Sequence, residues 1–288
     1  MPAKLIDGIE IARRVKEEVQ RQVARHASEG RRVHLTAILV GSTPAAEVYA
    51  HRQAEACRAV GIEYTLLTLP DDLSQRQLRD EIRRLNKDST VTGIMLHAPL
   101  PAHMDLARTQ FEIDVIKDVE GVNPANIGYV VYHHTLIAPC TAGAAVELIH
   151  STGVDLYGKE AVVVGASEIA GKPIALLLLG DGATVTLCHI GTRDLALHTR
   201  RAEVLVVAVG KPGLIGPEHV RPGAIVIDVG INRVKQPDGS TRTVGDVQFD
   251  AVKEVAGHIT PVPGGVGPMT VAMLLKNTLR AADIVFGK

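Results

Sequence analysis

The chain has 288 residues, 46% of them hydrophobic, and a formal net charge of −1. This length and apolar content suffice for one large domain or two ordinary domains with substantial cores. Because acidic and basic residues are interspersed and nearly balanced, the composition favours a small-molecule ligand over nucleic acid or an anionic membrane. No segment approaches the roughly 18 apolar residues of a membrane span, so a cytoplasmic protein is expected. No metal site is expected, since the cysteines are far apart and lack metal-site spacing.

Helical and strand patterns alternate along the first third of the chain. Ile11, Val15, Val19 and Val23 recur every four residues between charged neighbours, which predicts an amphipathic helix over about residues 9–28. The predicted segments that follow are a strand at 35–40, a helix at 44–60, a strand at 63–69, a helix at 74–87 and a strand at 93–96. This alternation indicates parallel strands joined by crossover helices.

A second alternating set begins after Pro139, with a helix predicted to open at Thr141. Its apolar strands are predicted at residues 161–164, 185–188, 204–209 and 224–229. Continuous apolar runs of this kind are typical of parallel strands buried on both faces. The polar stretch 235–242 indicates a surface loop or hairpin, and residues 269–284 are predicted to form the last helix.

A glycine-rich turn from Gly165 to Gly171 follows the first strand of the second set and opens a helix. A pyrophosphate would meet free backbone N–H groups and the positive end of the helix dipole there. The pattern is GxSxxxG rather than GxGxxG, and taken alone it is equally consistent with a plain tight turn. Its place in a run of four parallel strands favours a dinucleotide site, with Val209 and Ile231 following two later strands at the same edge.

The identity of the dinucleotide depends on the end of the next strand. That strand ends at His189, with no aspartate or glutamate to accept hydrogen bonds from both ribose hydroxyls of NAD. The absence favours NADP and leaves NAD as the alternative. Arg193 could supply positive charge for a 2′-phosphate, and a solvated surface arginine is an equally good interpretation.

Four motifs complete the pattern: Lys117-Asp118-Val119-Glu120-Gly121, Pro139-Cys140-Thr141-Ala142-Gly143, the turn at 165–173, and Val262-Pro263-Gly264-Gly265-Val266-Gly267-Pro268-Met269-Thr270. With them the chain resembles the methylenetetrahydrofolate dehydrogenase/cyclohydrolase family almost from end to end. The resemblance implies an α/β fold of two domains around a cleft, the second a Rossmann-type parallel sheet, with the C-terminal helix returning to the first. The implied domains are a folate-like substrate domain at 1–140, completed by 270–288, and an NAD(P)-binding domain at 141–269. It also implies a homodimer formed through the nucleotide domains.

The resemblance carries site residues over by position. The implied catalytic set is Tyr49, Gln53, His97 and Glu120, in which Tyr49 would orient the ring system and Glu120 would accept pterin N–H donors. The remaining substrate contacts implied for a tetrahydrofolate-type ligand are Pro263, Gly264, Gly265, Pro268 and Thr270. The expected cofactor contacts are Gly165, Ser167, Ile169, Lys172, Pro173, His189, Arg193, Val209 and Ile231.

Three of these positions depart from the family pattern. Gln53 stands where the family has a lysine, His97 where it has a glutamine, and Glu120 where it has an aspartate. In the family the lysine serves hydrolysis of the methenyl cation, and glutamine cannot exchange a proton in this way. Hydride transfer depends chiefly on holding the methylene carbon against the nicotinamide. The prediction is therefore NAD(P)-dependent oxidation of 5,10-methylenetetrahydrofolate to 5,10-methenyltetrahydrofolate, with cyclohydrolase activity weak or lost.

Two alternatives stay open from the sequence. His97 and Glu120 could form a new acid–base pair for different C–N or cyclic-amidine chemistry on a folate-like substrate, or His97 could merely replace a glutamine hydrogen bond. The chain could also be a non-catalytic folate or nucleotide binder. The presence of two complete ligand motifs argues against that last reading.

Overall fold

The structure, a computed structural model, describes residues 2–236 and 239–287. The chain forms two compact units. Unit 1 comprises Met1–Arg13 and Thr141–Thr270, and unit 2 comprises Arg14–Cys140 and Val271–Lys288. Three helices contribute residues to both units: α1 (Gly8–Ser28), α6 (Cys140–His150) and α10 (Val266–Phe286).

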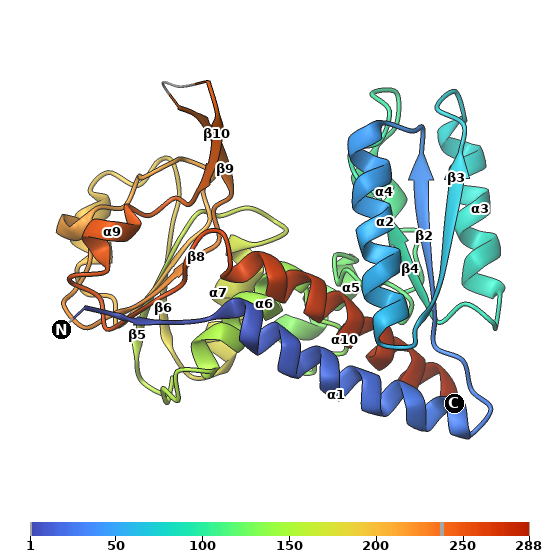
Figure 1. Cartoon of the computed structure of the whole chain (residues 1–288), viewed down its shortest axis with the longest axis horizontal. Helices are drawn as coiled ribbons and strands as arrows, with labels where there is room; N and C mark the ends of the chain where they lie inside the picture. Colours follow the sequence, from blue (N-terminus) through green and yellow to red (C-terminus); the bar gives the residue numbers. More distant parts are fainter. Residues whose placement is uncertain (1, 237–238, 288) are drawn as a thin grey trace. The chain divides into compact units, whose positions relative to one another are not determined.

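Unit 2 contains a parallel sheet of three strands in the order β3-β2-β4. The central strand pairs on both sides, with Ile38 opposite Leu67 and opposite Leu96. Helices α2 and α3 flank these strands in Figure 1. The elements of this unit are β2 (His34–Val40), α2 (Pro44–Ala59), β3 (Glu63–Leu69), α3 (Gln75–Lys87), β4 (Gly93–Leu96), α4 (Leu106–Gln110) and α5 (Pro124–Val131).

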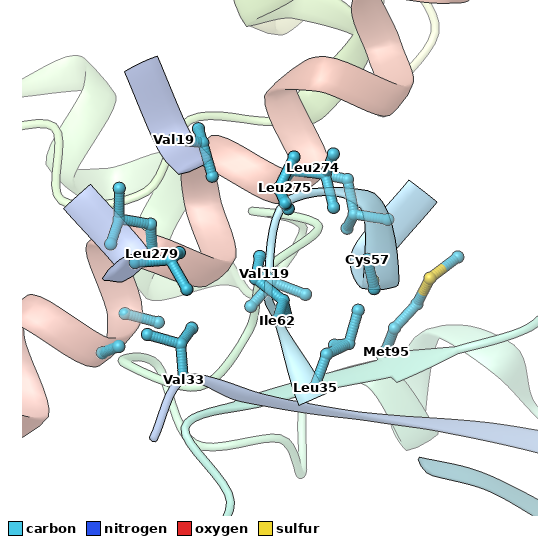
Figure 2. Packing of buried hydrophobic residues seen from close by; sticks show 14 of the residues in the cluster. Val19, Val33, Leu35, Cys57, Ile62, Met95, Val119, Leu274, Leu275 and Leu279 are labelled. Atoms are coloured by element: carbon cyan, nitrogen blue, oxygen red, sulfur yellow. The ribbon is translucent and has the colours of Figure 1, made fainter. Parts of the chain in front are cut away.

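Two hydrophobic cores divide the residues of β2 between them. Leu35 and Ala37 belong to the core that includes α1, α2 and α10, whereas Ile38 and Val40 belong to the core that includes α3. Alternate residues of a strand face opposite sides of the sheet, which explains the division. Figure 2 shows the first core, in which residues of α10 pack with the sheet: Leu274, Leu275 and Leu279. The C-terminal part of α10 is therefore built into the core of unit 2.

The start of α2 is fixed locally, which matters because this helix carries Tyr49 and Gln53. The Thr43 side chain accepts a hydrogen bond from the Ala46 backbone N–H at 3.2 Å. An N-cap of this kind satisfies a donor that the first turn of a helix leaves free. The sequence of the cap thus sets where the first turn begins and which residues share a helix face.

Unit 1 contains a six-stranded parallel sheet in the order β1-β11-β8-β7-β5-β6. From β5 the chain moves outward to β6 and returns past β5 to β7, which places a topological switch point at the carboxyl ends of β5 and β7. The two-domain α/β fold with a Rossmann-type parallel sheet is thereby confirmed. The strands of this sheet are β1 (Lys4–Leu5), β5 (Glu160–Val164), β6 (Thr184–Cys188), β7 (Val204–Val207), β8 (Ile225–Asp228) and β11 (His258–Ile259).

Helices and one hairpin complete unit 1. The hairpin pairs β9 with β10 in antiparallel register and extends away from the six-stranded sheet in Figure 1. Part of the predicted loop at 235–242 lies outside the described residues, namely 237–238. The remaining elements are α7 (Gly171–Gly180), α8 (Leu195–Thr199), η1 (Pro217–His219), β9 (Asn232–Lys235), β10 (Thr241–Val244) and α9 (Phe249–Val252).

The first 13 residues were expected in the same domain as residues 14–140, whereas in the structure they group with unit 1. The reason is strand pairing: β1 adds to β11, and the Ala3 backbone N–H donates to the Lys253 carbonyl at 2.7 Å. Across residues 2–236 and 239–287, no helix is long and apolar enough to cross a membrane. The same residues contain no group of three or more His, Cys, Asp or Glu side chains arranged to hold a metal ion.

Candidate active site

Tyr49 and His97 make the first contact of the candidate substrate site in unit 2. Tyr49 lies in the second turn of α2 and is 52% exposed, whereas His97 directly follows β4 and is buried. Their rings meet edge to face, with centroids 5.7 Å apart and planes at 87°. This is a favoured aromatic geometry. The contact fixes the Tyr49 ring while much of it stays accessible to a flat ligand.

Gln53 lies one helical turn beyond Tyr49 and is only 5% exposed. Its Nε2 donates to Met95 Sδ at 2.7 Å, and its Oε1 accepts from the Tyr64 hydroxyl at 3.1 Å. Met95 itself belongs to the core drawn in Figure 2. An amide held at both ends carries no charge and cannot act as a base near neutral pH. Position 53, where the sequence comparison with the family expected a lysine, therefore holds a fixed, neutral group.

The His97 imidazole lies in surroundings that favour its neutral form, because burial lowers its pKa. Its backbone N–H donates to the Ile38 carbonyl at 2.9 Å, which extends the pairing of β4 with β2 by one residue. Its Nε2 is buried and has no hydrogen-bond partner in the part of the chain that the structure describes. Nor do any hydrogen bond or ion pair join His97 to Glu120 within those residues. No contact among the described residues therefore supports the acid–base pair considered as an alternative.

Glu120 carries an acid that titrates near neutrality. Burial, followed by the nearby Asp118 carboxylate, raises its pKa from 4.5 to about 7, against a lowering hydrogen bond from the Leu96 backbone N–H. Burial raises the pKa of Tyr49, and the Glu120 carboxylate raises it further. Glu120 and Tyr49 therefore lie close enough to interact electrostatically. No cationic side chain among the described residues contributes to the pKa of Glu120.

Asp118 and Lys117 hold the loop that carries Glu120, a role that the sequence motif did not reveal. The Lys117 ammonium donates to two carbonyl oxygens at the end of α3, those of Leu85 at 3.0 Å and Asp88 at 2.7 Å. The Asp118 carboxylate accepts from three donors, the backbone N–H groups of Gly121 and Asn123 and the Asn126 amide, at 3.1, 2.7 and 3.0 Å. The basic residue of this motif is thus committed to the helix end and leaves Glu120 without a counter-ion.

Asn277 ties α10 to the same loop and was missed by the sequence analysis. Its Nδ2 donates to the carbonyl oxygens of Val119 and Ala138, each at 2.9 Å. It also approaches Cys140 Sγ at 3.3 Å. These partners are more than 130 residues away in sequence, so no local pattern could have indicated the contact.

Gly165 and Gly171 form a cradle at the start of α7 in unit 1. Gly165 has φ of +111°, and a Cβ there would lie 2.1 Å from the Ala208 carbonyl oxygen. A Cβ on Gly171 would lie 1.8 Å from the Gly165 carbonyl oxygen, so both positions require glycine. The Ser167 hydroxyl accepts from the Gly171 backbone N–H at 3.3 Å. The bare backbone at this helix N-terminus fits the pyrophosphate of a dinucleotide.

The other expected residues of this turn occupy different environments. Ile169 is 63% exposed, and Pro173 is buried in the first turn of α7. Lys172 lies at the surface, 3.7 Å from Glu168 in an exposed ion pair. Such a pair is weak, so the Lys172 ammonium remains free to meet a phosphate.

The turn after β6 presents nitrogen donors, and the carboxylate that follows it, Asp194, caps α8 by accepting from the Leu197 backbone N–H at 3.1 Å. His189 Nδ1 accepts from the Gly191 backbone N–H at 3.0 Å, which leaves Nε2 as the protonated, donating nitrogen. The Thr192 hydroxyl accepts from the His189 backbone N–H at 2.9 Å and closes the turn. Arg193 is exposed and has no hydrogen bond or ion pair with the rest of the described chain. The end of β6 is therefore suited to an anionic 2′-phosphate.

The proline and glycine loop at 261–268 lines a hollow of about 110 Å³ in unit 1, together with residues 228–231 and Thr243. Gly264 has φ of +109°, and a Cβ on Gly265 would lie 2.6 Å from the Pro261 carbonyl oxygen. Pro268 lies in the first turn of α10, and the Thr270 hydroxyl donates to the Val266 carbonyl at 3.2 Å. Most of the surface that lines the hollow comes from carbon atoms of proline, glycine, valine and isoleucine residues. Such a surface is suited to receive a flat ring.

The predicted residues are divided between the units. In unit 2, Tyr49 contacts His97 and lies near Glu120. Gln53 lies one helical turn beyond Tyr49 and is bonded to Met95 and Tyr64. All the expected cofactor residues lie in unit 1, including the exposed Val209 and Ile231. The proline and glycine loop, expected to complete the substrate site, also belongs to unit 1.

Known proteins match the whole chain. The family models of tetrahydrofolate dehydrogenase/cyclohydrolase match twice, the catalytic domain at residues 6–120 and the NAD(P)-binding domain at residues 139–285. The chain is 49% identical over 280 residues to Bifunctional protein FolD 3 of Roseobacter denitrificans, covering 97% of this chain and 96% of that protein.

Solved structures agree with the sequence matches. The crystal structure of the bifunctional enzyme FolD, a methylenetetrahydrofolate dehydrogenase/cyclohydrolase from Campylobacter jejuni, superposes with a TM-score of 0.93 at 41% identity, covering 98% and 99% of the two chains. The Trypanosoma brucei enzyme, solved with NADP cofactor and inhibitor, gives 0.92 at 38% identity and covers 100% of both chains. With its glycine cradle, its parallel sheets and these matches along its full length, the chain belongs to the tetrahydrofolate dehydrogenase/cyclohydrolase family.

Proposed function

We propose that this chain oxidises 5,10-methylenetetrahydrofolate to 5,10-methenyltetrahydrofolate with NADP, and that its cyclohydrolase activity is weak or lost. In this proposal residues 14–140 and 271–288 bind the folate, and residues 141–270 bind the dinucleotide. The observation that carries the loss of hydrolysis is Gln53, a buried amide held between Met95 and Tyr64. Family membership supports the oxidation.

The side chains of unit 2 suit the oxidation and not the hydrolysis. NADP, when bound, supplies the acceptor for the hydride. Tyr49 offers an accessible ring that is held by His97 and can orient a pterin. Glu120 offers a carboxyl for pterin N–H groups. Hydrolysis needs a group that can activate water, and the amide of Gln53 cannot take a proton.

NADP rather than NAD is supported by the end of β6. His189 keeps Nε2 as a donating nitrogen, and Arg193 is exposed with no ion pair among the described residues. No carboxylate directly follows β6 to bind ribose hydroxyls, and the next one along the chain, Asp194, caps α8. The Trypanosoma brucei relative was solved with NADP. The glycines at 165 and 171 leave the space that a pyrophosphate needs.

The first test is a spectrophotometric assay with 5,10-methylenetetrahydrofolate and either NADP or NAD, following reduced nicotinamide and the methenyl product together. We expect reduction, faster with NADP, while methenyl absorbance persists at the level of an enzyme-free control. Methenyl loss as rapid as its formation would contradict the claim of weak hydrolysis. Absence of reduction with both cofactors would contradict the oxidation.

The variant Gln53→Lys tests the role of this position directly. A lysine there restores a group that exchanges protons, and general acid–base groups contribute roughly 10²–10⁴-fold. We expect methenyl hydrolysis to rise by at least about tenfold, given partial restoration of that effect. Gln53→Met is the matched control, since it keeps the length of the side chain and adds no titratable group. Equal hydrolysis by both variants would show that this position does not limit the reaction.

We also infer, from the resemblance to the family, a homodimer formed through the nucleotide-binding unit and a cytoplasmic location. Light scattering of the purified chain measures the first. A mass of a single 30.7 kDa chain at micromolar concentration would contradict it.

A further inference from the structure

Two buried aspartates in unit 1 lock the loops at the carboxyl ends of β7 and β8. Asp228 is 3% exposed and Asp246 is 0% exposed, and neither forms an ion pair with any described cationic side chain. Buried carboxylates without a counter-ion need several hydrogen-bond donors. In each of these two aspartates, all the hydrogen bonds to the carboxylate come from N–H donors of the surrounding loops.

Asp246 connects the two strand ends. Its Oδ2 accepts from the backbone N–H groups of Val209 at 2.7 Å and Gly210 at 2.9 Å, which lie two and three residues after the end of β7. Its Oδ1 accepts from Asn232 Nδ2 at 2.8 Å, directly after Ile231. One carboxylate therefore fixes both segments that carry the exposed apolar side chains of Val209 and Ile231.

Asp228 holds Asp246 in place. Its carboxylate accepts from three backbone N–H groups, those of Gly230, Asp246 and Val247, at 3.0, 3.0 and 2.9 Å. The packing is reciprocal, because a Cβ on Gly230 would lie 2.2 Å from Asp246 Cγ, and a Cβ on Gly245 would lie 1.8 Å from Asp228 Oδ2. Each aspartate thus occupies the space that the glycine beside the other leaves free.

The place of this pair in the sheet indicates what it serves. In a doubly wound sheet the second strand binds the adenosine ribose, and the strands on the other side of the first receive the nicotinamide half. Here β6 is the second strand, and β7 and β8 lie on the other side of β5. Asp228 also borders the hollow lined by the loop at 261–268.

We propose that Asp246, seated by Asp228, is the positioning residue that sets the ends of β7 and β8 to receive the nicotinamide half of the cofactor. The inference rests on the proposed function, because it takes NADP as the ligand. It predicts that damage to the Asp246 network weakens the nicotinamide half of binding and spares the adenosine half.

The decisive variant is Asn232→Asp, measured by calorimetric binding of NADP and of adenosine 2′,5′-bisphosphate, which lacks the nicotinamide half. It replaces a donor 2.8 Å from Asp246 with a second carboxylate. Loss of a charged hydrogen bond and the new repulsion should raise the dissociation constant of NADP at least about tenfold. The dissociation constant of the bisphosphate should change by less than about twofold, since the end of β6 is untouched. Thr184→Glu, a change of equal charge at an exposed position at the amino end of β6, away from the strand ends under test, should alter neither dissociation constant.

The double variant N232D/D246N tests the geometry itself. The new amide at position 246 can donate to the new carboxylate at position 232 while its carbonyl still accepts from Val209 and Gly210. NADP affinity should therefore return to within about threefold of the wild-type value. General destabilisation would give no such rescue and would weaken both ligands equally, and either result would overturn the inference.

Two further outcomes are informative. If Asn232→Asp does not fold, Asp246→Asn is the variant to measure, because it keeps the side-chain volume. It should raise the dissociation constant of NADP by about threefold, since a neutral amide is a poorer acceptor than a carboxylate. Unchanged NADP affinity in Asp246→Asn would overturn the inference. Wild-type protein that binds NADP but does not oxidise methylenetetrahydrofolate would remove the proposed reaction, and the binding comparison would still decide this inference.

Discussion

Replacing Glu120 with glutamine should stabilise the protein at high pH while impairing its function. Burial, followed by the nearby Asp118 carboxylate, raises the pKa of the Glu120 carboxyl, so the folded chain holds it in an environment that disfavours its charged form. Glutamine has the same shape and no charge to bury. The variant therefore isolates the free-energy cost of this carboxylate.

The size and sign of the effect follow from the two pKa values. Below pH 4.5 the carboxyl is protonated in both the folded and the unfolded chain, and the full stability is present. As pH rises to about 7, the unfolded chain has lost the proton and the folded chain still holds it, so the free energy of unfolding falls. The step from 4.5 to about 7, at about 1.4 kcal/mol per pKa unit, gives a loss of up to about 3 kcal/mol in the wild type. Glu120→Gln should not show this loss.

Urea unfolding followed by circular dichroism at pH 5 and pH 8 measures the difference, since the chain has no tryptophan to report fluorescence. The stability of the variant relative to wild type should rise with pH, and only the transition of unit 2 should shift if the units unfold separately. Glu112→Gln is the control without a pH trend. Partial burial alone would raise the pKa of Glu112, but Arg79 and Arg83 lower it below the ordinary 4.5. Glu112 is therefore ionised in both the folded and the unfolded chain from pH 5 to pH 8, and the stability difference between this variant and wild type should be the same at both pH values. Parallel pH profiles for wild type and Glu120→Gln would refute the reasoning. The Michaelis constant for the folate should increase in Glu120→Gln.

Two other predictions concern the glycine cradle and the thiols. Gly171→Ala should raise the dissociation constant of NADP by more than about tenfold, because the added Cβ would overlap the Gly165 carbonyl. Gly128→Ala is the control, since the space around Gly128 is open and the dissociation constant should not change. Equal NADP binding by both variants would contradict the proposed pyrophosphate site. Cys57 is fully buried and burial raises its pKa to about 12, so maleimide at pH 8 should label it only after unfolding. Peptide mapping by mass spectrometry separates it from the other two thiols, and rapid labelling of Cys57 itself in the native protein would contradict its placement.

Long periodic elements could be predicted from the sequence, whereas short pairings could not. The apolar repeat every four residues predicted a helix at about 9–28, and α1 spans Gly8–Ser28. Strands β1 and β11 have two residues each, too few to show any alternation. Their pairing joins residues more than 250 positions apart, so no local pattern could indicate that the first 13 residues group with unit 1.

In the candidate site, too, local features could be predicted from the sequence and long-range contacts could not. The spacing of four residues placed Tyr49 and Gln53 on one helix face, and the family pattern pointed to position 53 as the altered one. Nothing in the local sequence indicated that Tyr64 and Met95 hold the Gln53 amide, since Gln53 lies on α2 whereas Tyr64 lies on β3 and Met95 on β4. For the Asp228 and Asp246 pair, the sequence contains only a weak indication. Each aspartate has a glycine within two residues, and the structure shows that this glycine makes room for the other aspartate.

The three departures from the family pattern have one physical consequence in common. Gln53 is neutral, burial favours the neutral form of His97, and Glu120 is the one group of the catalytic set that can carry a charge near pH 7. The nearby Lys117 cannot compensate, because its ammonium is bound to the carbonyl oxygens of α3. In the proposed reaction the substrate becomes a cation, and a lysine about 4 Å away would oppose that charge by up to about 4 kcal/mol at an effective dielectric constant of 20. In the function proposed above, Gln53 avoids this repulsion and lacks the proton exchange that hydrolysis requires. On that proposal, the amide at position 53 favours formation of the methenyl product and its survival.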